Sequence, residues 1–252
     1  MTVKVQAIDR AIRILKLFSE ERKELKLTEI SEELDLNKST VHGIISTLRY
    51  HRLIDQDEET QKYRLGLYLM ELGERVANSM DIIQISHPII DELCTTMEET
   101  VHLAALEGKE VVYIDKKESN QSIRIISAIG ARNPAYCTGV GKAMLAFKDV
   151  DEIYESLPDE LVQLTPNTIT DKEELLRELE EIRLQGYALD NEENSAGLTC
   201  VAAPIFDSTG KAVYAISVSG PTMRMNYKQI EKAREIVMES TKKISKELGY
   251  KF

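Results

Sequence analysis

Length and composition indicate a soluble globular protein of two domains, because 42% of the 252 residues are hydrophobic and no apolar run approaches the roughly 18 residues that span a bilayer. Since no apolar leader preceded by positive charge begins the chain, we expect a cytoplasmic protein with no membrane partner. The three cysteines, Cys94, Cys137 and Cys200, lie far apart without CxxC spacing, which argues against a disulfide framework and the common zinc motifs, and no metal or cofactor is indicated.

The first predicted element is an amphipathic helix over about residues 6–19. Its apolar residues Ile8, Ile12, Leu15 and Phe18 recur at intervals of four, three and three, which is the spacing of one helical face. We expect this face to close the core of a small N-terminal domain.

The pattern of residues 27–48 predicts two short helices joined by a tight turn, a helix-turn-helix, so double-stranded DNA is the leading partner. Asn37 can cap the second helix by accepting a hydrogen bond from a free amide, and Leu36 and Val41 are placed as a hydrophobic staple. A polar surface on an ordinary helical domain is the alternative. Four apolar residues of the second helix have helical spacing and should face inward: Val41, Ile44, Ile45 and Leu48.

Residues 49–66 suit two short strands around a polar turn, the wing of a winged helix. Residues 1–65 hold 12 Lys and Arg against 12 Asp and Glu, so this domain can bind phosphates only if its cations cluster. We expect modest affinity from one copy and a doubling of contacts on dimerisation. The candidate DNA-binding residues lie on the second helix, at its end or on the wing: Lys38, Ser39, Thr40, His42, Ser46, Arg49, Lys62 and Arg64.

A linking helix is expected over residues 66–80. Apolar residues 65, 69, 72 and 76 form one stripe, with residues 67 and 70 beside it. So much apolar surface on a connector favours packing against a second copy of the chain, although packing on its own domain remains open.

The rest of the chain predicts an α+β domain. Residues 66–252 hold 20 of the 32 basic and 31 of the 43 acidic side chains, so they carry the whole net charge of −11 and should repel DNA. Antiparallel strands with helices laid across them predict a core of six strands. The strands are expected at residues 101–107, 110–116, 122–127, 187–191, 199–206 and 212–219, and the helices at about 82–98, 140–147, 149–156, 171–185 and 224–248.

Residues 130–143 end in glycines just before a predicted helix. Free backbone amides at the positive end of the helix dipole could bind an anion there, although a simple loop with glycines at positive φ is the alternative. A phosphate-binding P-loop would need glycine where Tyr136 stands and Ser or Thr where Ala143 stands, so nucleotide hydrolysis is not expected.

A second polar segment, residues 190–205, is followed by Ser217 and Ser219. These two serines are two positions apart on a predicted strand, so they share one face, and two hydroxyls on an otherwise apolar strand indicate a small polar pocket. They could also be ordinary sheet serines, and Cys200 an ordinary buried thiol.

In this order the features resemble the IclR family of bacterial transcriptional regulators, nearly from end to end. The resemblance implies a winged helix-turn-helix domain at residues 1–65, a linking helix at 66–80, and an effector-binding and oligomerisation domain of GAF-like or profilin-like topology at 81–252. It also implies a homodimer or homotetramer on DNA. The markers are residues 5–11, the helix pair, the wing ending at 63–66, the turn at 139–143, the stretch 197–204 and Ser217-Val218-Ser219-Gly220-Pro221.

The resemblance further implies a site for a small organic-acid effector. Backbone amides at residues 139–141 and serine hydroxyls can donate to a carboxylate without a full positive charge. Asp190 fits an acid ligand less well and could accept from a ligand hydroxyl or from the amides of residues 191–194. We expect the walls to include residues 129–136 and Met and Leu side chains of the following helix. The implied effector-binding residues are Gly139, Val140, Asp190, Cys200, Ser217 and Ser219.

The leading expectation is a regulator, repressor or activator, whose operator binding an organic acid modulates. A DNA-binding protein whose C-terminal domain only oligomerises is one alternative. An enzyme is another, with Cys137 or Cys200 as nucleophile beside His102, or with Asp190 and Glu193 as acid and base. Sequence separation gives no evidence that these residues meet, so no catalytic residue is assigned.

Overall fold

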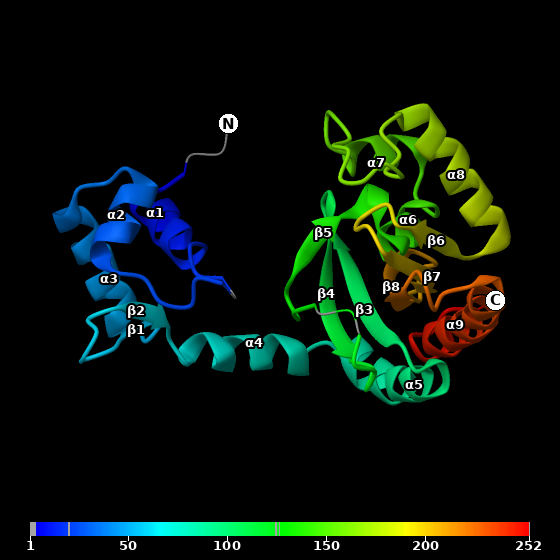
Figure 1. Ribbon diagram of the computed structural model, residues 1–252, viewed down its shortest axis with the longest axis horizontal. Coiled ribbons are helices and arrows are strands. Elements are labelled where there is room, and N and C mark those ends of the chain that lie inside the picture. Colours follow the sequence, from blue (N-terminus) through cyan, green and yellow to red (C-terminus); the bar gives the residue numbers. More distant parts are fainter. Residues whose placement is uncertain (1–3, 20, 124, 126, 252) are drawn as a thin grey trace. The chain divides into compact units, whose positions relative to one another are not determined.

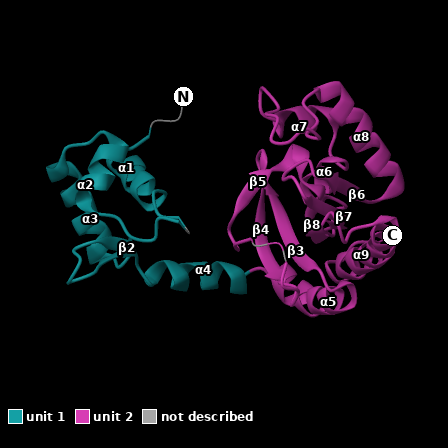
Figure 2. Ribbon diagram, viewed as in Figure 1, with its two compact units in different colours: residues 1–79 teal, residues 80–252 magenta. Residues whose placement is uncertain are grey.

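The computed structural model describes residues 4–19, 21–123, 125 and 127–251. The chain folds into two compact units, residues 1–79 and residues 80–252 (Figure 2). Each unit has its own hydrophobic core.

The first unit is a winged helix-turn-helix, as the sequence predicts (Figure 1). Three helices pack around a core that includes Ile14, Ile30 and Ile45, and an antiparallel strand pair forms the wing. The elements are α1 (Gln6–Leu15), α2 (Leu27–Leu34), α3 (Lys38–Tyr50), β1 (Ile54–Gln56), β2 (Tyr63–Leu65) and α4 (Tyr68–Asn78).

The predicted apolar face of the first helix is partly wrong, and the helix is shorter than expected. α1 ends at Leu15, and its fully buried residue is Ile14. Ile8 and Ile12 of the predicted face remain 61% and 47% exposed. Ala11, Ile14, Leu15 and Phe18 form an overlapping helical stripe, and periodicity alone could not decide which stripe the other helices would cover.

The turn between α2 and α3 lies where the sequence predicts it, but the predicted side-chain cap is absent among the described residues. Asn37 holds the N-cap position of α3, yet its side chain accepts no hydrogen bond from the helix. The turn relies instead on Asp35, whose backbone is left-handed with φ of 50°, and on the Ser31 hydroxyl, which donates to the Leu36 carbonyl at 2.5 Å. Leu36 also packs against the core that contains Val41, so apolar contacts fix the start of α3.

The linking helix α4 keeps its apolar side chains exposed. None of the residues described for α4 is fully buried, although Leu69 and Leu72 are half-buried. Met70 and Val76 are mostly exposed, as is Leu67 just before the helix. Most of the apolar surface of α4 is therefore not covered by its own unit.

The second unit is an α+β domain built on a six-stranded antiparallel sheet, as expected, with the strand order β5-β4-β3-β8-β7-β6. Helices α5 and α9 cover one face of the sheet, and α6, α7 and α8 lie over the other (Figure 1). Alternate side chains of each strand supply these two cores, so Val201 packs with α5 and α9 while Ala202 packs with α6. The strands are β3 (Thr100–Glu107), β4 (Glu110–Lys117), β5 (Arg132–Pro134), β6 (Ala188–Asn191), β7 (Leu198–Phe206) and β8 (Ala212–Pro221), and the helices are α5 (Asp81–Met97), α6 (Gly139–Leu145), α7 (Val150–Glu155), α8 (Lys172–Gln185) and α9 (Tyr227–Glu247).

One predicted strand is misplaced. Residues 124 and 126 of the strand expected at 122–127 lie outside the described residues, and the described remainder forms no strand. The sixth strand is β5, which pairs with β4 at the edge of the sheet. A strand of three residues that ends in Pro134 carries no alternating pattern, and proline is tolerated only because this strand is an edge.

Candidate functional site

A polar cavity of about 170 Å³ lies between the sheet and the beginning of α6. All six residues that the family resemblance assigns to an effector line it: Gly139, Val140, Asp190, Cys200, Ser217 and Ser219. They come from α6, β6, β7 and β8, four elements spread over some eighty residues of sequence. Among the described residues of the lining there is no lysine and no arginine.

Strand register brings the polar side chains of the cavity floor together. Cys200 pairs with Asp190 on one side and with Ser219 on the other, and His102 pairs with Ser217. Directly paired residues of neighbouring strands point to the same face of a sheet. The hydroxyl oxygens of Ser217 and Ser219 lie 3.2 Å apart, so the prediction that they share a face is confirmed.

The beginning of α6 needs its glycines for close packing. A Cβ on Gly141 would lie 2.1 Å from the carbonyl oxygen of Ala135, and a Cβ on Gly139 would lie 3.3 Å from the side chain of Ala202. The sequence analysis expects the backbone amides of residues 139–141 to be free for a ligand, but one of them is already bonded within the protein. The N–H of Gly141 donates to Thr138 Oγ1 at 3.2 Å, so the prediction is wrong for that amide.

Asp190 is buried at the edge of the cavity and organises the turn that follows β6. Its Oδ1 accepts hydrogen bonds from the N–H of Glu193 at 2.8 Å and, more weakly, from the N–H of Asn194 at 3.5 Å. Burial raises the pKa of Asp190 to about 6, against the opposing effect of the Glu193 amide. The turn role that the sequence allowed for Asp190 is the one seen.

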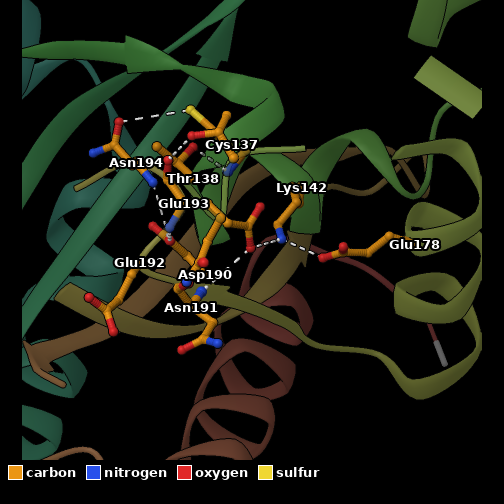
Figure 3. Close-up of polar contacts among 12 residues, drawn as sticks. Cys137, Thr138, Lys142, Glu178, Asp190, Asn191, Glu192, Glu193 and Asn194 are labelled. Atoms are coloured by element: carbon orange, nitrogen blue, oxygen red, sulfur yellow. Dashed lines mark hydrogen bonds and ion pairs between the residues drawn. The ribbon is translucent and has the colours of Figure 1, made fainter. Parts of the chain in front are cut away.

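Sequence reasoning missed an ion cluster behind the cavity, formed by Lys142, Glu178 and Glu193 (Figure 3). Lys142 is fully buried; its Nζ lies 2.5 Å from Glu193 Oε1 and also pairs with Glu178 of α8. Burial disfavours the charged amine, but the two carboxylates outweigh that cost and raise the pKa of Lys142. Its partners lie 36 and 51 residues away in the sequence, so local pattern gave no sign of the cluster.

Most of the remaining cavity wall differs from the expectation. Of the predicted segment 129–136 only Asn133 lines the cavity, and Met144 and Leu145 of α6 lie in the core instead. Sheet register could have indicated His102, which stands opposite Ser217. The polar lining residues that sequence reasoning did not assign are His102, Tyr113, Ser127, Thr138, Asn194 and Ser195.

The thiols near the cavity lack the properties of a catalytic nucleophile. A reactive cysteine needs a lowered pKa, whereas burial raises the pKa of Cys137 to about 12 and that of Cys200 well above its usual value. Burial also lowers the pKa of His102 to about 4, and its Nε2 lies 2.7 Å from the hydroxyl of Ser127. Neither thiol is therefore activated as a nucleophile, and the His102 imidazole is hydrogen-bonded to Ser127 rather than to a thiol.

Within the described part of the chain no group of His, Cys, Asp and Glu side chains could hold a metal ion. In that same part no helix is both long and apolar enough to cross a membrane.

The candidate DNA-binding residues lie on the outer face of α3 and on the wing. The side chains of Lys38, Ser39, His42, Ser46, Arg49 and Arg64 are exposed, and those of Thr40 and Lys62 are half-buried. Arg49 donates to Gln56 Oε1 at 2.8 Å, which ties the end of α3 to the wing. All eight candidate residues thus lie on the helix or wing positions that the sequence predicts.

Known proteins match this chain along nearly its whole length. Residues 7–58 match the IclR helix-turn-helix domain and residues 74–246 match the bacterial transcriptional regulator IclR C-terminal domain. The HTH-type transcriptional regulator XynR of Escherichia coli (strain K12) is 38% identical over 98% of each chain. The crystal structure of Thermotoga maritima IclR is similar with a TM-score of 0.80 and 36% identity, over 96% of this chain and 98% of that one.

An IclR homolog from Microbacterium hydrocarbonoxydans, crystallised with 4-hydroxybenzoate, is similar with a TM-score of 0.85 and 25% identity, over 96% of this chain and 99% of that one. The relatives in these comparisons are transcriptional regulators rather than enzymes. With both of its domains matched, the chain belongs to the IclR family of bacterial transcriptional regulators.

Proposed function

We propose that this regulator binds a DNA operator through its winged helix and that a small organic acid in the polar cavity modulates that binding. The observation that carries the proposal is the gathering, around one cavity, of the six residues that the family resemblance implies. In a polar and mostly enclosed cavity, hydrogen-bond donors and acceptors of the protein can replace the water molecules around a small ligand.

For DNA, we place α3 in the major groove. Ser39, Thr40, His42 and Ser46 would face base edges, because short polar side chains on a recognition helix read hydrogen-bonding patterns there. The cations Lys38, Arg49, Lys62 and Arg64 would contact phosphates and fix the register. The wing tip carries Asp57, Glu58 and Glu59, so phosphate contact from the wing would come from Lys62, just before β2, and from Arg64 in β2.

For the ligand, the cavity limits size and charge. A cavity of about 150 Å³ can hold one benzene molecule, so a volume of about 170 Å³ suits a compact acid of similar size. With no lysine or arginine described in the lining, a carboxylate would be held by neutral donors such as the hydroxyls of Ser217 and Ser219. The complex of the Microbacterium hydrocarbonoxydans homolog with 4-hydroxybenzoate supports an acid of this size.

For the assembly, we propose a homodimer or homotetramer in which α4 packs against a second copy. Its exposed residues Met70 and Val76 would then be covered, and two winged helices would meet two half-sites. A ligand that prefers one arrangement of the copies would change the affinity for the operator. The operator would change the affinity for the ligand by the same coupling free energy. Such a regulator acts on the chromosome, which in a bacterial cell lies in the cytoplasm.

The direct test is a set of melting temperatures measured with a panel of small carboxylates that includes 4-hydroxybenzoate. A ligand of the folded state raises the melting temperature, so one or a few acids should do so. The double substitution Ser217→Ala/Ser219→Ala should abolish the rise, whereas Ser240→Ala, at a buried serine of α9 outside the cavity lining, should keep it. A panel without any response would favour a domain that only oligomerises.

A further inference from the structure

Lys142 is the least expected charged group in the second unit. It lies one turn into α6, is fully buried, and does not line the polar cavity. Lysine is almost never fully buried unless paired, and here carboxylates of two other segments meet its amine (Figure 3). A buried ion pair is weak evidence for stability, because the cost of desolvation offsets the attraction, so its presence calls for another role.

One partner of Lys142 is central to residues 190–195, which comprise the end of β6 and the turn after it and are called the 190–195 loop. Glu193 donates its N–H to Asp190 Oδ1 at 2.8 Å, and its carbonyl accepts from the hydroxyl of Thr168 at 2.6 Å. Its carboxylate is nearly fully buried: Oε1 meets Lys142 at 2.5 Å and the N–H of Asn191 at 3.4 Å, and Oε2 has no hydrogen-bond partner among the described residues. In the described structure Lys142 is therefore the cation that compensates this carboxylate.

The ion pair joins two walls of the cavity. Thr138, Gly139 and Val140, just before Lys142, form one wall, and Asp190, Asn194 and Ser195, on either side of Glu193, form another. Among the described residues, Lys142 is the side chain of α6 that pairs with Glu193, and this ion pair ties the two walls together beside the weaker contact of Cys137 with Asn194. Glu178 adds a tie from the same amine to α8.

We infer that Lys142 is the positioning residue of the polar cavity: through Glu193 it holds the 190–195 loop against α6 and so sets the spacing of the groups that would meet a ligand. The ligand in this statement rests on the proposed function, but the positioning itself does not. Loss of the amine should free the loop, open the cavity to solvent and leave the sheet intact.

The three cysteines report on this directly, because each thiol is buried in a different place. Cys200 lines the cavity, and Cys137 lies under its wall, with Sγ 3.9 Å from Asn194 Oδ1. Cys94, on α5, lies in the core on the other face of the sheet, together with residues of α9. Opening the loop should expose Cys137 and Cys200 and make their thiolates accessible, while Cys94 stays protected.

The experiment measures the rate of alkylation of each cysteine by N-ethylmaleimide in the native full-length protein, with the sites resolved by mass spectrometry. In Lys142→Met we expect at least tenfold faster labelling of Cys137 and Cys200 and an unchanged rate at Cys94. The matched control is Glu178→Gln, which keeps the pair of Lys142 and Glu193 and should label as the unmodified protein does.

Lys142→Met leaves a buried carboxylate uncompensated and could fail to fold, so Glu193→Gln provides the second variant. It leaves no buried charge unpaired, because Lys142 retains Glu178, and it should produce the same selective pattern at a smaller size. Equal acceleration at all three cysteines would show global destabilisation and overturn the inference, as would no acceleration in either variant. Since no ligand is added, the result is independent of whether an organic acid binds.

Discussion

Among single residues, Asp190 gives the second unit a defined dependence on pH. Burial raises its pKa to about 6, above the 3.8 that an unperturbed aspartate has. The folded protein thus keeps this proton to a higher pH than the unfolded chain does. The stability that Asp190 contributes is therefore complete below about pH 4 and is lost as the pH rises through about 6.

Replacing this carboxyl should remove the pH dependence. We expect the free energy of unfolding of Asp190→Asn, relative to that of the unmodified protein, to rise by on the order of 2 to 3 kcal/mol between pH 4 and pH 7, because each pKa unit corresponds to about 1.4 kcal/mol. The asparagine Oδ1 can still accept from the amide of Glu193. Urea unfolding at several pH values measures the difference.

A turn aspartate of the same domain supplies the control. A hydrogen bond from the side chain of Thr209 lowers the pKa of Asp207, so its stabilising contribution is present at neutral pH and is lost as the pH falls. The relative stability of Asp207→Asn should accordingly change in the opposite sense, and it should do so below about pH 4 while staying nearly flat between pH 4 and pH 7. A relative stability of Asp190→Asn that stays flat from pH 4 to pH 7 would contradict the assignment.

The same carboxyl links ligand binding to protons. An anionic ligand beside Asp190 disfavours the ionised carboxyl, so its affinity should be higher at pH 5.5 than at pH 7.5. This trend should disappear in Asp190→Asn.

At the scale of elements, we expect the two ends of α3 to have different roles in DNA binding. Arg49→Ala should weaken binding to every DNA sequence and lower the slope of log affinity against log salt by about one, because it removes one phosphate contact. Ser39→Ala should instead alter the preference among operator variants. Fluorescence anisotropy with an operator fragment and an unrelated duplex, over a range of salt, separates the two effects.

Arg22→Ala is the matched control for Arg49, because Arg22 is an exposed arginine paired with Glu33 of α2 and lies outside α3 and the wing. It should leave both affinity and salt slope nearly unchanged. An Arg49→Ala protein that loses only operator binding, with unrelated DNA unaffected, would contradict a phosphate role.

Elements with strong periodicity were predictable from the sequence, and those held by distant contacts were not. α8 and α9 combine helical spacing with capping residues, Asp171 and Asn226, whose side chains accept from the first turn. β7 and β8 are long, mostly apolar segments. β5 has three residues and exists because β4 offers an edge, so nothing in Arg132–Pro134 itself predicts a strand.

The candidate site divides in the same way. The order of the family motifs predicted six lining residues, and strand alternation predicted the common face of Ser217 and Ser219. His102 and Tyr113 join the cavity because of the register between β3, β4 and β8, which periodicity does not fix. The ion pairs of Lys142 could not be predicted, because they form only where α8 and the loop after β6 both approach α6.

At the scale of the whole molecule, assembly should depend on α4. The substitution Met70→Glu/Val76→Glu places charges at two exposed apolar positions of α4, and we expect it to shift the protein toward monomers at micromolar concentration in sedimentation velocity. Operator affinity should fall with it, since a single neutral winged helix makes few phosphate contacts. Glu74→Lys, at an exposed polar position of the same helix, should leave the mass unchanged.

An unchanged mass for Met70→Glu/Val76→Glu would show that another surface joins the copies. In that case contacts of α4 between the copies would not couple ligand binding in the cavity to DNA binding.

The central claim is that ligand in the polar cavity and DNA on α3 are coupled. The most direct measurement is the affinity for a fragment from upstream of the regulator's own gene, with and without a saturating amount of the carboxylate that raises the melting temperature most. We predict at least a fivefold change in the unmodified protein, the lower end of typical allosteric coupling, and none in Ser217→Ala/Ser219→Ala, which should still bind the fragment. Equal affinities with and without a ligand that is shown to bind would contradict the account.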